Sequence, residues 1–154
     1  MRSITLVLLF FVSTTQVAGQ VNWMTFEEME SAFASKPQKV FIDFYTDWCG
    51  YCHRMDRYVF SNQEIIDKLN SEYYAVKMDA ETRDSIFFGG KRFVNRSSSN
   101  DAGRKGYHEL ALLLGSKENG DFQLPTIAIF DTNFQVIKKY HHYMHSKKLL
   151  KVLL

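Results

Sequence analysis

The chain has 154 residues, of which 45% are hydrophobic and 23% charged, and its formal net charge is +2. This length is enough for one compact domain with its own hydrophobic core. The near balance of basic and acidic residues argues against a general electrostatic surface for nucleic acid or anionic lipid, so no nucleic-acid partner is expected.

The first 19 residues have the layout of a secretory signal peptide. Arg2 is followed by an apolar stretch at residues 4–12 and by small residues at 17–19 (VAG). The apolar stretch is shorter than the about 20 residues that span a bilayer, so we expect cleavage after Gly19, with an uncleaved anchor as the alternative. The sequence therefore predicts a periplasmic or secreted protein whose mature form, residues 20–154, has no membrane span.

Helix and strand signals alternate through the first half of the mature chain. Residues 25–28 (TFEE) have a capping-box pattern that predicts a helix to about Ala34. The apolar run at 39–45 (KVFIDFY) predicts a buried strand, and a helix with its N-terminus near Cys49 should follow. A second capping-box pattern at 61–64 (SNQE) predicts the next helix.

The second half continues this alternation after a predicted strand at residues 73–78. Residues 86–94 (IFFGGKRFV) predict two short strands joined by a Gly-Gly turn, and a polar loop is expected at 95–105. A helix is predicted at 106–114. This extra segment is either decoration or a surface for substrates.

The last elements are two strands and a helix. Strands at 126–130 and 135–141 should form an antiparallel hairpin, and Ser146 should cap a final helix over 147–154. Alternating strands and helices predict an α/β fold in which helices cover a sheet.

The most informative feature is the only pair of cysteines, Cys49 and Cys52, in residues 47–53 (DWCGYCH). A disulfide across so short a loop contributes little chain entropy, which argues against a purely structural bridge. The pair lies where a strand gives way to a helix, and unpaired N–H groups at a helix N-terminus favour a thiolate. The pattern therefore favours redox chemistry.

Metal binding is the alternative for the two thiols. A structural zinc site needs about four ligands, but the chain has no second CxxC, and the nearest histidine pair, His141 and His145, lies too far along the chain from Cys52 for zinc-finger spacing. No metal is expected, but a secreted carrier could hold Cu or Zn through the two thiolates.

Three further residues have two interpretations each. Asp43, on the apolar strand, is either a solvated edge residue or a buried acid whose raised pKa suits proton transfer. Pro125 marks a turn or the start of an edge strand. His53 is either an exposed helix residue or a cation that stabilises a Cys49 thiolate.

Three segments, in the same order, resemble thioredoxins. Residues 41–52 resemble the active-site segment, residues 76–79 the strand that carries a lysine near the active site, and residues 124–130 the cis-proline segment. The resemblance covers roughly residues 23–154. It implies a thioredoxin fold, a central mixed β-sheet flanked by helices, with a small β-hairpin and loop insertion at about 81–105 before the third core helix.

The resemblance also implies roles for individual residues. Cys49 would be the exposed attacking thiol and Cys52 the buried resolving thiol. Asp43 would exchange a proton with Cys52, Lys77 would pair with Asp43, and Pro125 would place a backbone edge beside the thiols. The positions expected to contact substrate are Trp48, Gly50, Tyr51 and Leu124.

The resemblance implies thiol-disulfide exchange with protein substrates. The protein is expected to be a monomer that uses the Cys49–Cys52 disulfide and no other cofactor. An upstream redox partner is expected to exchange electrons with this disulfide. The Gly50-Tyr51 pair also occurs in bacterial periplasmic disulfide isomerases. Two residues depart from those isomerases: Trp48 precedes Cys49 as in thioredoxins, and Leu124, not threonine, precedes Pro125. We therefore expect a reductase-like role, with isomerase or oxidase as alternatives.

Overall fold

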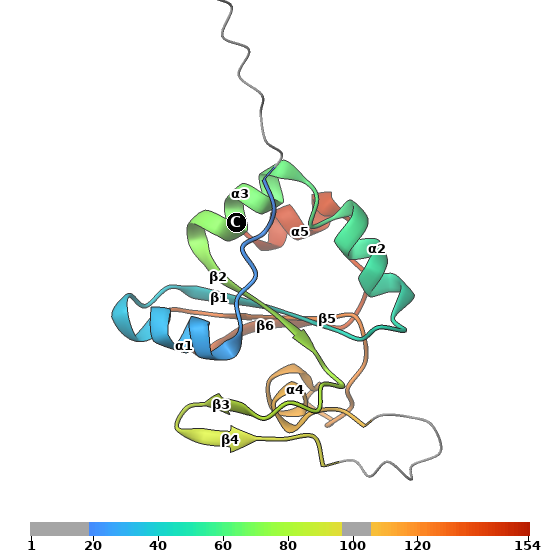
Figure 1. Cartoon of the computed structure of the whole chain (residues 1–154). Coiled ribbons are helices and arrows are strands. Elements are labelled where there is room, and N and C mark those ends of the chain that lie inside the picture. Colours follow the sequence, from blue (N-terminus) through green and yellow to red (C-terminus); the bar gives the residue numbers. More distant parts are fainter. Residues whose placement is uncertain (1–18, 97–105) are drawn as a thin grey trace, which may run out of the picture.

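The computed structural model describes residues 19–96 and 106–154. Figure 1 shows five helices and six strands in these ranges. In chain order they are α1 (Phe26–Ser35), β1 (Lys39–Tyr45), α2 (Gly50–Tyr58), α3 (Gln63–Glu72), β2 (Tyr73–Asp79), β3 (Ile86–Phe88), β4 (Lys91–Phe93), α4 (Glu109–Gly115), β5 (Thr126–Phe130), β6 (Val136–Tyr140) and α5 (Ser146–Val152).

The central sheet is mixed and has the strand order β2-β1-β5-β6. β1 is parallel to β2, whereas β5 is antiparallel to both β1 and β6. Helices cover both faces: α2, α3 and α5 lie on one, and α1 and α4 on the other (Figure 1). This is the central mixed sheet flanked by helices that the sequence predicted.

Two hydrophobic clusters, one on each face, hold the helices to the sheet. Phe41 of β1 belongs to the cluster with α2, α3 and α5, while Ile42 and Phe44 belong to the cluster with α1 and α4. Because side chains alternate along a strand, Asp43 faces the same way as Phe41, toward α2. Lys77 of β2 is the register partner of Asp43 and shares that face.

The two predicted capping boxes can be compared with the structure. The capping box of Thr25 and Glu28 at α1 is confirmed, with both reciprocal bonds present. The one predicted from Ser61 is wrong, because Asn62 caps α3 and accepts from the Ile65 N–H at 3.3 Å. The Ser61 hydroxyl instead donates to the Arg57 carbonyl at 2.7 Å.

The last helix also differs from its prediction. Ser146 is the first residue of α5 and does not cap it; its hydroxyl donates to the Tyr58 carbonyl at the end of α2, at 3.0 Å. The N-cap position is His145, without a side-chain bond, and the helix ends at Val152. The predicted helix at 106–114 begins later, at Glu109, with His108 as its N-cap.

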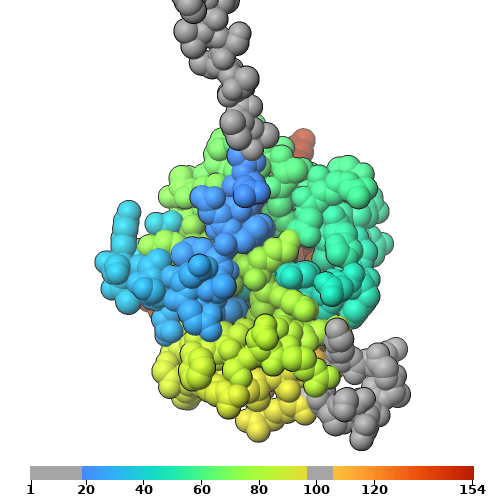
Figure 2. Space-filling view, in the orientation of Figure 1, coloured from blue at the N-terminus to red at the C-terminus, as the bar shows by residue number. Residues whose placement is uncertain are grey.

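The β3–β4 hairpin forms as predicted and packs against α1, as Figure 2 shows for the blue and yellow-green segments. Its turn is Gly89-Gly90, both with positive φ, which glycine adopts without steric cost. Glu30 of α1 accepts from the Gly89 N–H at 2.7 Å, and Phe26 meets Phe88 edge-on at 5.4 Å.

Two predictions fall largely outside the described residues: the signal peptide at 1–19 and the polar loop at 95–105. Among the residues that are described, no helix has the length and apolarity needed to cross a bilayer.

Candidate active site

A disulfide joins Cys49 to Cys52 at the start of α2, with 5.2 Å between their Cα atoms. Cys49 is the N-cap of the helix, and its Sγ accepts from the Cys52 N–H at 3.2 Å. The short loop after β1 is closed by a bond from the Cys49 N–H to the Thr46 carbonyl at 3.1 Å. The Cys49 sulfur is thus held at the positive end of the helix dipole.

Cys49 was expected to be exposed, but in this disulfide-bonded form it is only 5% exposed, against 3% for Cys52. Its sulfur lies against the helix N-terminus, where it accepts from the Cys52 N–H. Its neighbours Trp48 and Tyr51 are 63% and 58% exposed. Two exposed aromatic side chains therefore lie beside the cysteines in the sequence.

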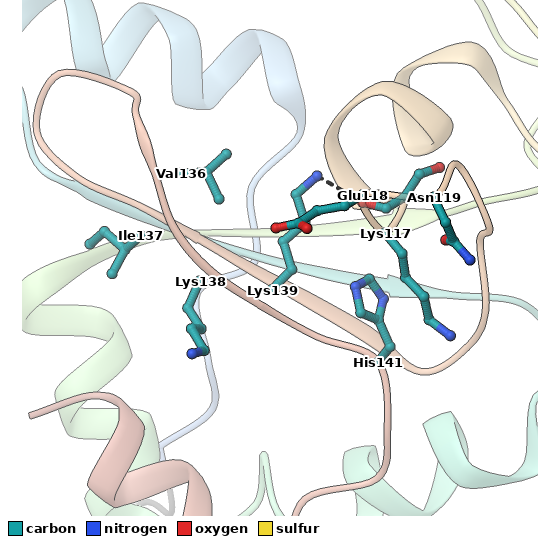
Figure 3. Close-up of a pocket in the computed structure, with 9 residues that line it drawn as sticks. Lys117, Glu118, Asn119, Val136, Ile137, Lys138, Lys139 and His141 are labelled. Carbon is teal, nitrogen blue, oxygen red and sulfur yellow. Dashed lines mark hydrogen bonds between the residues drawn. The ribbon is translucent and has the colours of Figure 1, made fainter.

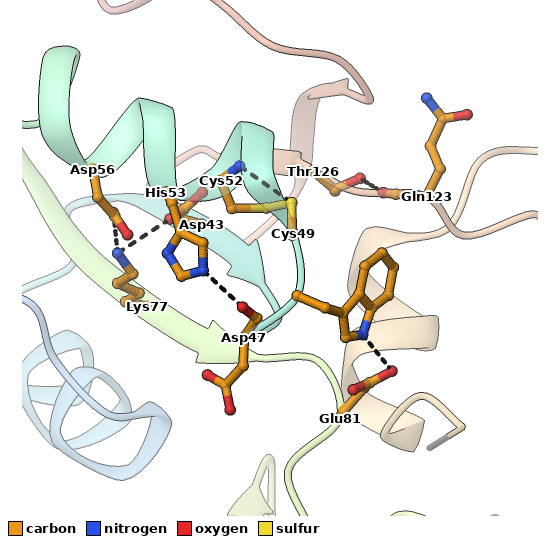
Figure 4. Close-up of a disulfide and its surroundings, with 11 residues drawn as sticks. Asp43, Asp47, Cys49, Cys52, His53, Asp56, Lys77, Glu81, Gln123 and Thr126 are labelled. Atoms are coloured by element: carbon orange, nitrogen blue, oxygen red, sulfur yellow. Dashed lines mark hydrogen bonds and ion pairs between the residues drawn. A yellow bond between two sulfur atoms is a disulfide. The ribbon is translucent and has the colours of Figure 1, made fainter. Parts of the chain in front are cut away.

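Asp43 is 2% exposed and lies beneath α2 (Figure 4). Burial raises the pKa of its carboxyl to about 7, the positive charge of Lys77 opposes this rise, and the nearby negative charge of Asp56 adds to it. The carboxyl can therefore gain or lose a proton near neutral pH, and the solvated-edge interpretation of Asp43 is wrong.

The ammonium of Lys77 lies between two carboxylates. It forms an ion pair with Asp56 Oδ1, on α2, and is 3.9 Å from Asp43 Oδ2 (Figure 4). The rings of Tyr45 and Trp23 also surround it, at 5.1 and 5.3 Å from their centroids. Lys77 is therefore shared, and its closer partner is Asp56.

Trp48 is tied to the segment that follows β2. Its indole Nε1–H donates to Glu81 Oε1 at 3.1 Å (Figure 4). Glu81 is itself 9% exposed, its N–H donates to Asp79 Oδ1 at 2.9 Å, and its carbonyl accepts from Asn95. The segment that follows β2 therefore helps to orient Trp48 next to the disulfide.

His53 is exposed on α2, and its ring is turned toward the loop before the helix. Nε2 lies 2.7 Å from the Asp47 carbonyl, and because a carbonyl only accepts, this nitrogen carries the proton (Figure 4). His53 therefore braces the loop that leads to Cys49.

The Leu124–Pro125 peptide bond is cis, as the resemblance implied. Thr126, the next residue, is the register partner of Phe44, so Pro125 lies at the end of β1 from which the cysteine loop leaves. The Thr126 hydroxyl donates to the Gln123 carbonyl at 2.5 Å and is 2.9 Å from His141 Nδ1.

His141 connects this segment to a pocket between β6 and the turn after α4 (Figure 3). Lys139 crosses the pocket and donates to the Ser116 carbonyl at 2.9 Å. Gln123 donates to the His141 carbonyl, so two hydrogen bonds fasten the cis-proline segment to the end of β6.

The family model for the thioredoxin-like domain matches residues 26–154. The chain belongs to this family. It is 30% identical over 105 residues to the thiol:disulfide interchange protein DsbD of Actinobacillus pleuropneumoniae, a match that covers 68% of this chain and 14% of that protein. The chain therefore spans a small part of the length of this relative.

Solved structures of thioredoxin-like proteins share the fold. A thioredoxin from Thermus thermophilus superposes with a TM-score of 0.60 at 15% identity, over 88% of this chain and 85% of that one. The reduced C-terminal domain of DsbD from Neisseria meningitidis gives 0.51 at 19% identity, over 81% and 87%.

The thioredoxin-like fold brings together Asp43, Lys77 and the two cysteines, as expected. Sequence reasoning missed Asp56 and Glu81. Asp56 follows Cys52 by four residues and therefore lies on the same helix face, so this spacing could have identified Asp56 from the sequence. Glu81 bonds to a residue 33 positions away, which no local pattern reveals.

No cluster of three or more histidine, cysteine or acidic side chains suited to a metal ion occurs in residues 19–96 and 106–154. A metal held here would have to rely on the two thiolates of the reduced form.

Proposed function

We propose that this chain is a protein thiol-disulfide oxidoreductase that works in the reducing direction through Cys49 and Cys52. The observation that carries the proposal is the disulfide at the N-terminus of α2 with the buried Asp43 beneath the same helix. The match to DsbD supports the same chemistry.

The reaction starts from the dithiol form. The Cys49 thiolate attacks one sulfur of a target disulfide, the target S–S bond breaks, and one target sulfur leaves as a thiolate. The product is a mixed disulfide between Cys49 and the target. The helix dipole and the Cys52 N–H favour the thiolate at Cys49 before the attack.

Cys52 completes the exchange. Its thiol gives a proton to the Asp43 carboxylate, and the resulting thiolate attacks Cys49 Sγ, which releases the second target thiolate. Two electrons pass from the cysteine pair to the target, and the Cys49–Cys52 disulfide forms again. Lys77 limits the rise in the pKa of Asp43, so that part of the carboxyl population is charged near neutral pH.

The target is proposed to bind as an extended segment beside the cis-proline. Leu124 and Pro125 provide a backbone edge, and Trp48, Gly50 and Tyr51 form the rest of the contact surface. His53 acts by bracing the loop that leads to Cys49 and, as a cation, by stabilising the Cys49 thiolate.

The protein is proposed to act as a monomer in the periplasm or outside the cell, after cleavage behind Gly19. A reductant in an oxidising compartment needs a continuing supply of electrons, so an upstream dithiol partner must reduce the Cys49–Cys52 disulfide after each turnover. N-terminal sequencing of the exported protein tests the cleavage position.

The equilibrium reduction potential of the Cys49–Cys52 pair, measured in dithiothreitol or glutathione buffers, tests the direction. A value near that of thioredoxin, about −270 mV, supports the reductase, and a value near about −120 mV supports an oxidant. Insulin reduction by the wild type and by Cys49→Ser tests the activity itself, and equal rates for the two would contradict it.

A further inference from the structure

A basic surface begins one turn of α2 beyond the disulfide. His53, Arg54, Arg57 and Tyr58 line a pocket on the exposed side of this helix. The spacing of Arg54, Arg57 and Tyr58, three and four residues apart, places them together on the helix surface. The pocket therefore collects two guanidinium groups close to the redox centre.

These guanidinium groups are not neutralised by any acidic side chain that the structure describes. Within the described parts of the chain, neither Arg54 nor Arg57 forms an ion pair. Asp56 is the only acidic residue of α2, and its carboxylate is engaged by Lys77. The overall charge of the chain is close to neutral, so this is a local excess of positive charge.

Two tyrosine side chains, Tyr51 and Tyr143, lie between the disulfide and this pocket. Tyr51, two residues after Cys49, lies 5.9 Å from the ring of Tyr143, and the Arg54 guanidinium lies 5.5 Å from the same ring. Stacking on Tyr143 fixes the direction of Arg54 while leaving it exposed. A peptide that leaves Cys49 along α2 would pass the tyrosines before it reaches the arginines.

The distances fix where the complementary charge should lie. Arg54 and Arg57 follow Cys49 by five and eight residues, which corresponds to about 7 to 12 Å along a helix. An extended peptide covers that span in about two to four residues. Acidic residues at those positions from the partner's cysteine would meet the guanidinium groups, and Arg pairs well with carboxylates.

From these observations we infer that the physiological partner carries acidic residues two to four positions from its reactive cysteine, and that Arg54 and Arg57 recognise them. This inference rests on the proposed function, because the mixed disulfide places the two segments side by side. The pair determines specificity and takes no part in the bond exchange.

Two synthetic disulfide peptides test the inference. They are identical except for glutamates or lysines at positions two to four on each side of the cysteine, and the reduced full chain is the reductant. We expect the acidic peptide to be reduced about tenfold faster at low ionic strength, and about equally fast in 0.5 M NaCl, where charges are screened beyond a few ångströms. The double variant Arg54→Gln/Arg57→Gln should lose the preference at low salt.

The matched control is Lys36→Gln/Lys91→Gln, which removes two exposed cations, one at the C-cap of α1 and one on β4, and should keep the preference. Equal rates of the wild type on both peptides at low salt would overturn the inference while leaving the proposed function intact. A preference that persists in the arginine variant, with far-UV circular dichroism unchanged, would also overturn it. Failure to reduce either peptide would contradict the proposed function itself.

Discussion

The ammonium of Lys77 forms an ion pair with Asp56 and stays 3.9 Å from the carboxylate of Asp43. Asp43 is the buried acid, yet the closer partner of the lysine lies on the active-site helix. Burial is the main cause of the raised pKa of Asp43. Lys77 lowers this pKa and Asp56 raises it, so the lysine's position between the two acids adjusts the proton affinity of Asp43.

Replacing Asp56 should therefore shift the pH dependence of exchange. In Asp56→Asn the charge that raises the pKa of Asp43 is lost and Lys77 is free to approach Asp43, so this pKa should fall. The midpoint of the pH–rate profile for reduction of a protein disulfide should move down with it. Asp67→Asn, on the exposed side of α3, is the control; a midpoint that stays put or rises in Asp56→Asn would contradict this assignment.

Removing the carboxyl of Asp43 should slow the second step of the exchange. Without a base beneath α2, the Cys52 thiol loses its proton less readily, and we expect Asp43→Asn to lower the rate of mixed-disulfide resolution by about a hundredfold at pH 7. Stopped-flow measurement with a fluorescent peptide disulfide separates this step from the first attack. A slower attack with normal resolution would be inconsistent with the proposed proton transfer.

Asp43 should also make stability depend on pH. Its folded-state pKa of about 7 exceeds the ordinary value of 3.8, so between these values the folded state binds more protons than the unfolded state. The free energy of unfolding should therefore fall as the pH rises from about 4 to about 7, by a few kcal/mol. Urea unfolding of the disulfide form at pH 5 and pH 8 measures this fall. Asp43→Asn should show a much smaller one, and an equal fall in both proteins would rule out Asp43 as its source.

Glu81 should matter for large substrates only. In Glu81→Ala the indole of Trp48 loses its hydrogen bond and its fixed orientation, so reduction of a protein disulfide should slow several-fold. Reduction of a small neutral disulfide, which does not reach the indole, should change little. Glu118→Ala, an exposed residue after α4, serves as the control. A similar loss on both substrates would point to a general structural defect.

The packing around Gly115 allows a direct test of the core next to β1. A Cβ at this position would lie 2.6 Å from a ring atom of Phe122 and 3.2 Å from Phe44. Gly115→Ala should therefore lower the free energy of unfolding by about 1–3 kcal/mol, because the rings must move. Leu113→Ala, at a 60% exposed site on the same helix, should have a much smaller effect in the same unfolding experiment.

Much of the fold and of the candidate site could be predicted from the sequence, because interactions between residues close in the chain determine it. The apolar run around Asp43 predicted a buried strand, the change from a strand pattern to a helix pattern placed the thiols at a helix start, and Gly89-Gly90 predicted the hairpin turn. The capping box at Thr25 is another local pattern, complete within four residues. In each case, the residues that determine the structure are close to one another in the sequence.

The sequence predictions were wrong or incomplete where a side chain forms its hydrogen bond with a distant residue or where two residues compete for the same role. Ser61 and Asn62 are both good N-caps, but the Ser61 hydroxyl bonds back to Arg57 and leaves Asn62 to cap α3. Ser146 reaches the Tyr58 carbonyl, 88 residues away, instead of capping its own helix. The bond between Trp48 and Glu81 likewise depends on the completed fold.

The most direct test of the central claim is to trap the exchange intermediate. Reduced Cys52→Ser retains Cys49 but cannot resolve a mixed disulfide, so incubation with a disulfide-containing protein should yield a stable covalent adduct. Peptide mass spectrometry should place the bond at Cys49. An adduct absent from Cys52→Ser, or one formed equally well by Cys49→Ser, would contradict thiol-disulfide exchange through Cys49.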